Sequence, residues 1–191
     1  MCIRDRPEGD LQLNPSHALS CSHLRADRTR RHNGLVRLLH DVVTEIGGYA
    51  RIEPRSISEL RNERPDLDVR IGAARFLVDV TIRDPLCISN VRLASQGSLK
   101  LAEKAAADKV AKYSVMAQEA KAQFVPFAIE TFGGMCKAAA AWVKNLKKIA
   151  AQLYCSVDMA DLISEINQNI AIALARDNAS AVASCLHRSA K

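Results

Sequence analysis

The stretch RPDLDVRIGAARFLVDVTI, residues 64–82, decides the fold. Residues 66–71 alternate between apolar and polar side chains, which is typical of a half-buried β-strand. Residues 72–74, Gly-Ala-Ala, predict a turn. Residues 75–82 are strand-forming and mostly apolar, which predicts a strand in the middle of a sheet. The stretch therefore predicts a β-hairpin whose second strand is central.

An aspartate stands in the most apolar part of this hairpin. Asp79 lies between Val78 and Val80, where a carboxylate is unfavourable unless it is paired or bound to a cation. Asp66 opens the first strand, seven residues before a turn near Ala73, and Asp79 lies six residues after that turn. We therefore expect the two carboxylates to face each other across the hairpin, close enough to share one hard cation.

The residues alone leave simpler explanations open for both aspartates. Asp66 could be a turn residue, with Asp68 as its solvent-facing neighbour. Asp79 could pair with a buried arginine or lysine from elsewhere in the chain.

The flanking sequence predicts a mixed α/β domain with a helical tail. Apolar periodicity predicts helices at 33–46, 99–122, 135–151, 159–175 and 179–187, and strands at 49–53 and 124–129. Residues 85–97 are predicted to be a loop. The order of elements is α-β-β-β-α-β-α, followed by helices, and Pro126 places the last strand at a sheet edge or a bulge.

Four short motifs, in this order along the chain, resemble those of a nuclease family. Residues 64–66, Arg-Pro-Asp, and residues 79–81, Asp-Val-Thr, resemble the PD-(D/E)xK nuclease signature, with Thr81 where that signature usually has lysine. Residues 31–33, Arg-His-Asn, and 109–113, Lys-Val-Ala-Lys-Tyr, complete a closer resemblance. It is to the C-terminal restriction-like endonuclease domain of site-specific non-LTR retrotransposon (reverse transcriptase) proteins, over roughly residues 17–150.

The resemblance implies a restriction-endonuclease-like core over 33–151 and a helical tail over 152–191. It also implies a metal-dependent DNA endonuclease, a hydrolase that nicks DNA as part of a retroelement protein. Asp66 and Asp79 would hold Mg²⁺ or Mn²⁺, and Lys109 or Lys112 would replace the missing strand lysine, with Lys109 favoured. The implied partners are DNA and the remainder of a reverse transcriptase polyprotein.

Two other functions stay open. A catalytically inactive relative, kept as a DNA-binding or interaction module, is compatible with Thr81. A basic RNA-binding protein without nuclease ancestry is compatible with the charge. Lys109 and Lys112 on an alanine-rich helix could also be a solvated surface.

The N-terminal region carries half of a zinc-binding motif. His17 and Cys21 resemble the last two ligands of a CCHC zinc knuckle, so residues 17–32 are predicted to be the remnant of such a segment. A closed zinc site needs four ligands, which implies Zn²⁺ only in a longer parent chain. Residues 1–6 resemble a translated sequencing adapter, so 1–16 are predicted to be artefactual or disordered. We expect the chain before Arg25 to be poorly ordered.

Composition and charge fit an intracellular nucleic-acid partner. The 191 residues carry a net charge of +6, and residues 1–150 hold 24 basic and 17 acidic side chains. Aromatic residues make up only 4%, which argues against a base-stacking platform for single strands. The six cysteines form no CxxC pair and no apolar run is long enough to span a membrane, so we expect a nuclear or other reducing compartment and no membrane partner. Candidate phosphate contacts are Arg28, Arg30, Arg31 and Lys104.

Overall fold

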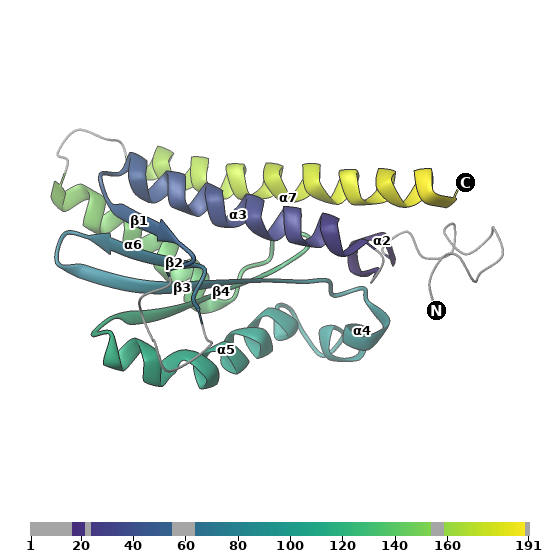
Figure 1. Ribbon diagram of the computed structural model, residues 1–191, viewed down its shortest axis with the longest axis horizontal. Coiled ribbons are helices and arrows are strands. Elements are labelled where there is room, and N and C mark those ends of the chain that lie inside the picture. Colours follow the sequence, from purple (N-terminus) through teal and green to yellow (C-terminus); the bar gives the residue numbers. More distant parts are fainter. Residues whose placement is uncertain (1–16, 22–23, 55–63, 154–158, 190–191) are drawn as a thin grey trace.

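The centre of the protein is a four-stranded mixed β-sheet in the order β1-β2-β3-β4 (Figure 1). The computed structural model describes residues 17–21, 24–54, 64–153 and 159–189. β1 pairs with β2 and β2 with β3 in antiparallel fashion, whereas β4 is parallel to β3. The strands are β1 (Tyr49–Ile52), β2 (Leu67–Ile71), β3 (Ala74–Arg83) and β4 (Gln123–Glu130).

The predicted hairpin is confirmed as β2 and β3. Ile71 pairs with Ala74, which leaves a two-residue turn whose first residue, Gly72, has a φ of +57° that favours glycine. β3 has a partner on each side and is therefore internal to the sheet. β4 is an edge strand, as Pro126 predicts, because proline cannot donate to a second neighbour.

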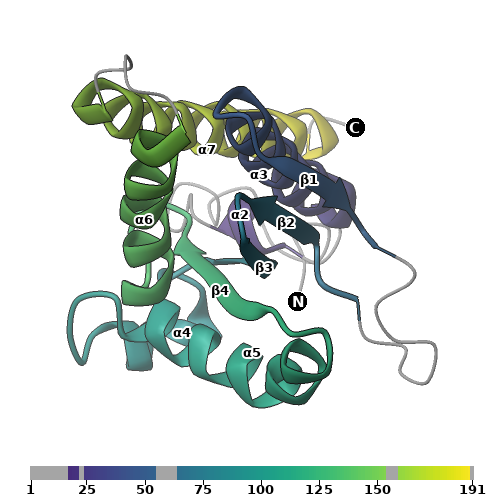
Figure 2. The same ribbon diagram turned by 90° about the vertical axis from the view of Figure 1, so that its left-hand side faces the viewer.

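The described part of the chain contains six helices, of which α3, α5 and α6 pack on the sheet. α5 lies on one face, α3 and α6 lie on the other, and α7 runs over α3 and α6 (Figures 1 and 2). The fold is therefore α/β, as the sequence predicts. The helices are α2 (His17–Ser20), α3 (Arg25–Glu45), α4 (Ile88–Ala94), α5 (Lys100–Glu119), α6 (Lys137–Leu153) and α7 (Met159–Ser189).

The main core lies between the sheet and the helices on the α3 and α6 side. Trp142 of α6 packs edge-on against Phe76 and Phe127, with ring centroids 6.2 and 6.1 Å away. A smaller cluster lies under α5. Buried members of the main core include Leu35, Leu39, Val43, Val69, Val78, Leu146, Ile166 and Ile170, and those of the smaller one are Leu77, Tyr113, Met116 and Ala117.

α3 is longer than its apolar pattern predicts. It begins at Arg25 and not at Asn33. The added turns are polar, so they carry no apolar stripe, and α7 stabilises them instead by hydrogen bonds. Arg30 donates to the Ser180 hydroxyl at 2.7 Å, and the Ser184 hydroxyl donates to Asp27 at 3.3 Å.

Two other predicted boundaries are wrong. The predicted loop at 85–97 contains α4, which has no buried residue and therefore no apolar periodicity to reveal it. The two predicted helices at 159–175 and 179–187 are one helix, α7. Its polar interruption is accommodated because Asn178 donates to the Thr131 carbonyl at 2.8 Å, so a buried partner replaces the expected break.

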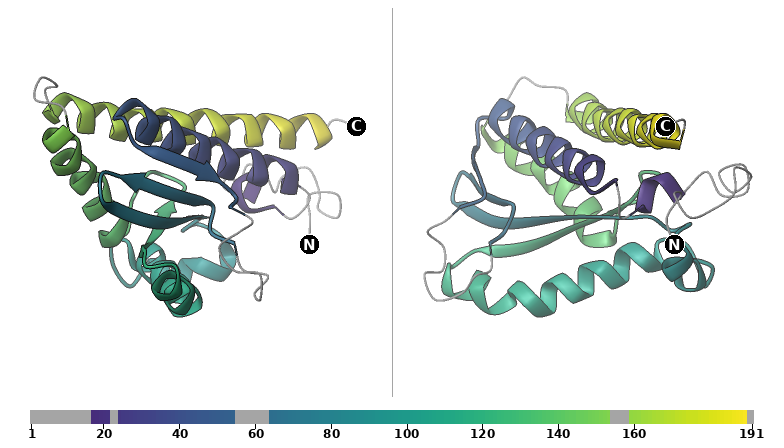
Figure 3. Two further views of the ribbon diagram at one scale, coloured as in Figure 1. Left: turned by 60° about the vertical axis from the view of Figure 1, so that its left-hand side comes forward. Right: turned by 45° about the vertical axis from the view of Figure 1, so that its right-hand side comes forward.

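The described residues before Arg25 are packed, which contradicts the expectation of poor order for 17–21. α2 lies against α7 (Figure 3), and Ala18 and Leu19 are buried. Their burial against a distant helix leaves no local sequence pattern. Residues 1–16, which we predicted to be artefactual or disordered, lie outside the described residues.

Candidate functional site

The candidate site forms where β2 ends and β3 continues. β2 begins at Leu67, so Val80 of β3 has no ladder partner on that side. The Asp66 carboxylate accepts a hydrogen bond from the Val80 N–H at 2.6 Å, and the His32 Nε2 lies 3.1 Å from the Val80 carbonyl oxygen. An acid and an imidazole thus satisfy the backbone groups that a longer β2 would have paired.

The two aspartates lie near each other at the end of the hairpin, but their side chains are held from different sides. The paired register ends with Leu67 opposite Val78, so Asp66 lies just beyond β2. Side chains alternate along a strand, and Leu77 packs under α5, so Asp79 points to the α5 face. The Asp66 carboxylate instead bonds the backbone of β3 and His32 of α3, and its charge still raises the pKa of Asp79. Asp68 is buried and bonded to Arg75 through both oxygens, so it is not the solvent-facing neighbour.

Asp79 is buried, with 3% of its surface exposed, and it has a cationic partner. The Lys109 ammonium of α5 lies 2.7 Å from Asp79 Oδ2, and the Thr81 hydroxyl donates to the same oxygen at 3.4 Å. Burial raises the pKa of the Asp79 carboxyl; hydrogen bonding to Lys109 opposes this shift, and the charge of Asp66 adds to it. Lys109 lies 30 residues further along the chain, so the hairpin sequence does not reveal it, and only the resemblance of residues 109–113 named it.

The two lysines of the 109–113 motif point to different partners. Lys109 reaches Asp79, whereas the Lys112 ammonium donates to the Tyr113 hydroxyl at 3.2 Å and lies 4.6 Å from the ring centroid. The Tyr113 hydroxyl donates to the Arg64 carbonyl oxygen at 3.2 Å. The tyrosine therefore attaches the chain just before Asp66 to α5, and of the two lysines only Lys109 contacts a candidate carboxylate.

His32 is the charged partner of Asp66. Its Nε2 lies 3.3 Å from Asp66 Oδ2, and its Nδ1 lies 3.2 Å from Asn33 Oδ1. The hydrogen bond to Asp66 raises the pKa of His32 to about 9, although burial opposes the shift. At neutral pH the ring is therefore protonated and donates from both nitrogens. The Arg-His-Asn motif was the only sequence signal for this contact, and it does not name the partner.

The four charges form two ion pairs, Asp66 with His32 and Asp79 with Lys109. No group of three or more His, Cys, Asp or Glu side chains that could hold a metal occurs among the described residues. Mg²⁺ is commonly held by only one or two carboxylates, with waters and substrate phosphates completing its shell. The donor chemistry of two nearby carboxylates therefore fits a hard divalent cation.

The structure sorts the predicted phosphate contacts into different environments. Arg31 is buried and donates to Asn178 Oδ1 at 2.7 Å and to the Leu19 carbonyl at 3.1 Å, so it cannot reach a phosphate. Arg30 is held by Asp27 and Ser180.

The other two predicted phosphate contacts are open to solvent. Arg28 is exposed. Lys104 is also exposed, and it forms an ion pair with Asp108 at 3.4 Å on the surface of α5.

The half zinc motif lies at α2. Cys21 is buried in a small apolar cluster with Ala18, Leu24 and Cys185, and His17 begins the helix. Cys21 therefore packs as part of an apolar cluster. That His17 and Cys21 bind Zn²⁺ in a longer parent chain stays a prediction.

No known protein family matches this chain, and no curated protein matches it. None of the helices in the described ranges is both long and apolar enough to cross a membrane.

Proposed function

We propose that this chain is a metal-dependent DNA endonuclease domain of the restriction-endonuclease-like fold. The observation that carries the proposal is that Asp79 of β3 forms an ion pair with Lys109 of α5 at 2.7 Å and lies close enough to Asp66, just before β2, for the charge of Asp66 to raise the pKa of Asp79. Thr81 stands two residues after Asp79, where the PD-(D/E)xK signature has lysine, and its hydroxyl contacts the same Asp79 oxygen as the Lys109 ammonium does. Lys109 of α5 thus supplies the positive charge that a strand lysine would supply.

Each side chain has a distinct role in this proposal. Asp66 and Asp79 would hold Mg²⁺ or Mn²⁺, which supplies charge to the phosphate oxygens and lowers the pKa of an attacking water. Lys109 sets a fixed positive charge beside the phosphate that is cut. His32 and the Val80 N–H hold Asp66 in position, because both contact the same carboxylate oxygen. Thus two side chains hold the metal, one stabilises charge and one positions a ligand.

The arrangement of elements supports the same assignment. An antiparallel hairpin followed by a parallel strand, with helices on both faces, fits the predicted α-β-β-β-α-β-α order, to which the short α4 is added. By the resemblance, the domain would belong to a retroelement reverse transcriptase protein. It would nick its target to expose a 3′ hydroxyl for reverse transcription.

A catalytically inactive DNA-binding module is the second candidate. It is favoured by the two ion pairs themselves, since His32 and Lys109 neutralise both carboxylates without a metal. In that case, the four charged groups would only stabilise the end of the hairpin.

A plasmid-nicking assay with Mg²⁺ or Mn²⁺ separates the two candidates. We expect the wild-type chain to nick, and Lys109→Met to lower the rate by about a hundredfold or more, because a positive charge beside the phosphate is lost. Lys112→Met is the matched control: it lies three residues away on the same helix and does not touch Asp79, so its rate should stay within about threefold.

Circular dichroism would show whether each variant is folded. Equal rates for the two lysine variants would reject the role of Lys109. No nicking by the wild type in either metal, with DNA binding retained, would reject the endonuclease and support the inactive module.

A further inference from the structure

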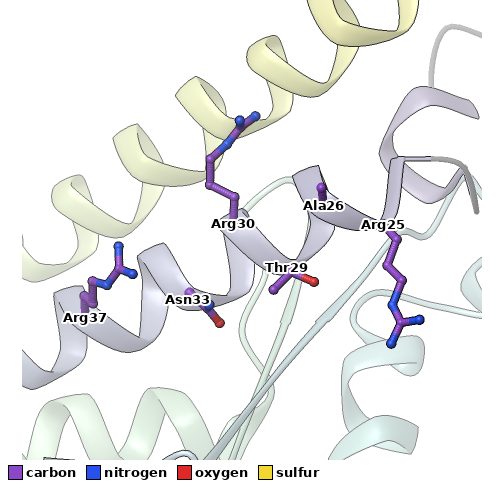
Figure 4. A pocket seen from close by; sticks show the side chains of 6 residues that line it. All are labelled: Arg25, Ala26, Thr29, Arg30, Asn33 and Arg37. Carbon is purple, nitrogen blue, oxygen red and sulfur yellow. The ribbon is translucent and has the colours of Figure 1, made fainter.

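The exposed side of α3 carries a row of hydrogen-bond donors. Arg25, Thr29, Asn33 and Arg37 follow one another at intervals of four residues and form a row inclined to the helix axis, which turns by about 40° at each step. With Ala26 and Arg30 they line a surface depression of about 670 Å³ (Figure 4). At 1.5 Å per residue, the row is about 18 Å long.

The chemistry of this row matches a chain of phosphates. Arginine, threonine and asparagine are among the side chains that proteins use to contact the nucleic-acid backbone. Neither Arg25 nor Arg37 has an ion-pair or hydrogen-bond partner among the described residues, so both charges are open to a ligand. No acidic side chain of the described residues lines the depression.

The row is physically joined to the candidate site. Asn33 accepts a hydrogen bond from His32 Nδ1, and the opposite ring nitrogen of His32 contacts Asp66. The His32 side chain alone would therefore separate a phosphate backbone bound at Asn33 from the Asp66 carboxylate. Thr29 and Asn33 point away from α7, whereas Arg30 points toward it (Figure 4).

A second basic groove lies between α4 and α5 and is the weaker candidate. It has a volume of about 440 Å³ and is lined by Arg83, Arg92 and Lys104, among others. Asp108 also lines it and forms an ion pair with Lys104 at 3.4 Å. This carboxylate partly neutralises the groove and would repel a phosphate.

We propose that the row Arg25–Thr29–Asn33–Arg37 on α3 binds the phosphate backbone of duplex DNA next to the cleavage site. The choice of DNA as the ligand rests on the proposed endonuclease function.

The test is the salt dependence of binding to a fluorescent 20-base-pair DNA duplex, measured by anisotropy in EDTA. Each arginine that contacts a phosphate contributes about 0.9 to the slope of log affinity against log salt. The double variant Arg25→Ala/Arg37→Ala should lower the slope by about 1.8 and weaken binding at 0.1 M salt by roughly tenfold to a hundredfold. Thr29→Val should weaken binding with little change in slope, because threonine is neutral.

Two exposed arginines serve as matched controls. Arg70→Ala, at the other end of β2, and Arg92→Ala, in the α4–α5 groove, should each leave the slope unchanged. An unchanged slope in the double variant, or an equal fall in Arg92→Ala, would overturn the inference. Tighter binding of an RNA duplex of the same sequence through the same two arginines would also overturn it.

Binding in EDTA keeps this inference separate from the proposed catalysis. A wild-type chain that binds DNA through the row and nicks nothing rejects the endonuclease and supports the row. A wild-type chain that nicks DNA, with an unchanged slope in the double variant, rejects the row alone.

Discussion

Neighbouring residues of α3, Arg31 and His32, enter two polar clusters of opposite character. Successive residues of a helix point about 100° apart, so Arg31 faces α7 while His32 faces the end of the β2–β3 hairpin. The cluster around Arg31, which we call the α3–α7 cluster, comprises Arg31, Asn178, Thr131 and Asp84. The candidate site comprises His32, Asp66, Asp79 and Lys109.

The α3–α7 cluster makes its hydrogen bonds mainly to neutral groups and is mostly buried, with Asn178 half-buried. Arg31 donates to an amide oxygen and a backbone carbonyl, Asn178 donates to the Thr131 carbonyl, and the Thr131 hydroxyl donates to Asp84 at 3.4 Å. Burial raises the pKa of Asp84, while hydrogen bonding to the Leu86 N–H opposes the shift. These contacts tie α3, α7 and the ends of β3 and β4 together, which is a structural role.

The candidate site differs in both exposure and charge. His32 is 32% exposed, Lys109 is 28% exposed and Asp66 is 19% exposed, so a ligand can reach them. Its contacts join opposite charges, and the charge of Asp66 acts on Asp79. The comparison teaches that a polar group on α3 supports the fold when it is buried and its hydrogen bonds are made within the protein. It is a candidate for chemistry when its partners are charged and open to solvent.

Removing Arg31 should give the largest change in stability. Arg31→Met leaves the Asn178 amide oxygen and the Leu19 carbonyl without their donor in a buried place, so we expect a loss of about 2–4 kcal/mol. Thermal unfolding should show a fall in Tm of roughly 5–15 °C for a chain of this size. Arg28→Met, on the exposed side of the same helix, is the control and should change stability by less than about 0.5 kcal/mol. A similar Tm for both variants would contradict the structural role of Arg31 in the α3–α7 cluster.

The His32–Asp66 pair should give a smaller, pH-dependent change. The folded pKa of His32 is about 9, above its ordinary value of 6.5, so its stabilising effect is complete below pH 6.5 and is lost as pH rises through about 9. His32 is partly exposed, which reduces the size of the effect. The loss of its charge should therefore lower the Tm, measured in EDTA, by about 2–4 °C between pH 6.5 and 9. His32→Gln should remove this part of the pH dependence. A wild-type Tm that does not fall relative to that of His32→Gln between pH 6.5 and 9 would contradict the pairing.

Much of the fold was predictable because it follows from the local periodicity of apolar residues in the sequence. The hairpin needs only alternation around Gly72, and the edge position of β4 follows from Pro126. The first turns of α3 and the continuity of α7 were not predictable, since distant partners stabilise polar residues there. The short α4 was not predictable either, because it buries no residue. Asn178 is an example: this polar residue is accommodated in α7 because its side chain accepts a hydrogen bond from Arg31 and donates one to the Thr131 carbonyl.

The acids of the candidate site were predictable from the hairpin, whereas Lys109 was predictable only from the motif resemblance and the contact of His32 with Asp66 was not predicted. Asp66 and Asp79 lie in one hairpin, so counting residues from the turn places them. Lys109 and His32 come from α5 and α3, and only the three-dimensional packing brings them to those carboxylates. The same limit applies to Arg31, because its burial depends on α7.

The most direct test of the central claim, that Asp66 and Asp79 hold a divalent cation, is Mn²⁺ binding measured by electron paramagnetic resonance. With a short DNA duplex present to supply phosphate oxygens, we expect the wild type and Lys112→Met to bind a single Mn²⁺ with similar affinity. Asp79→Asn should weaken binding by more than the roughly 10–100-fold that loss of an outer-sphere partner produces, because it removes a ligand. Equal Mn²⁺ binding by the wild type and Asp79→Asn would contradict the account.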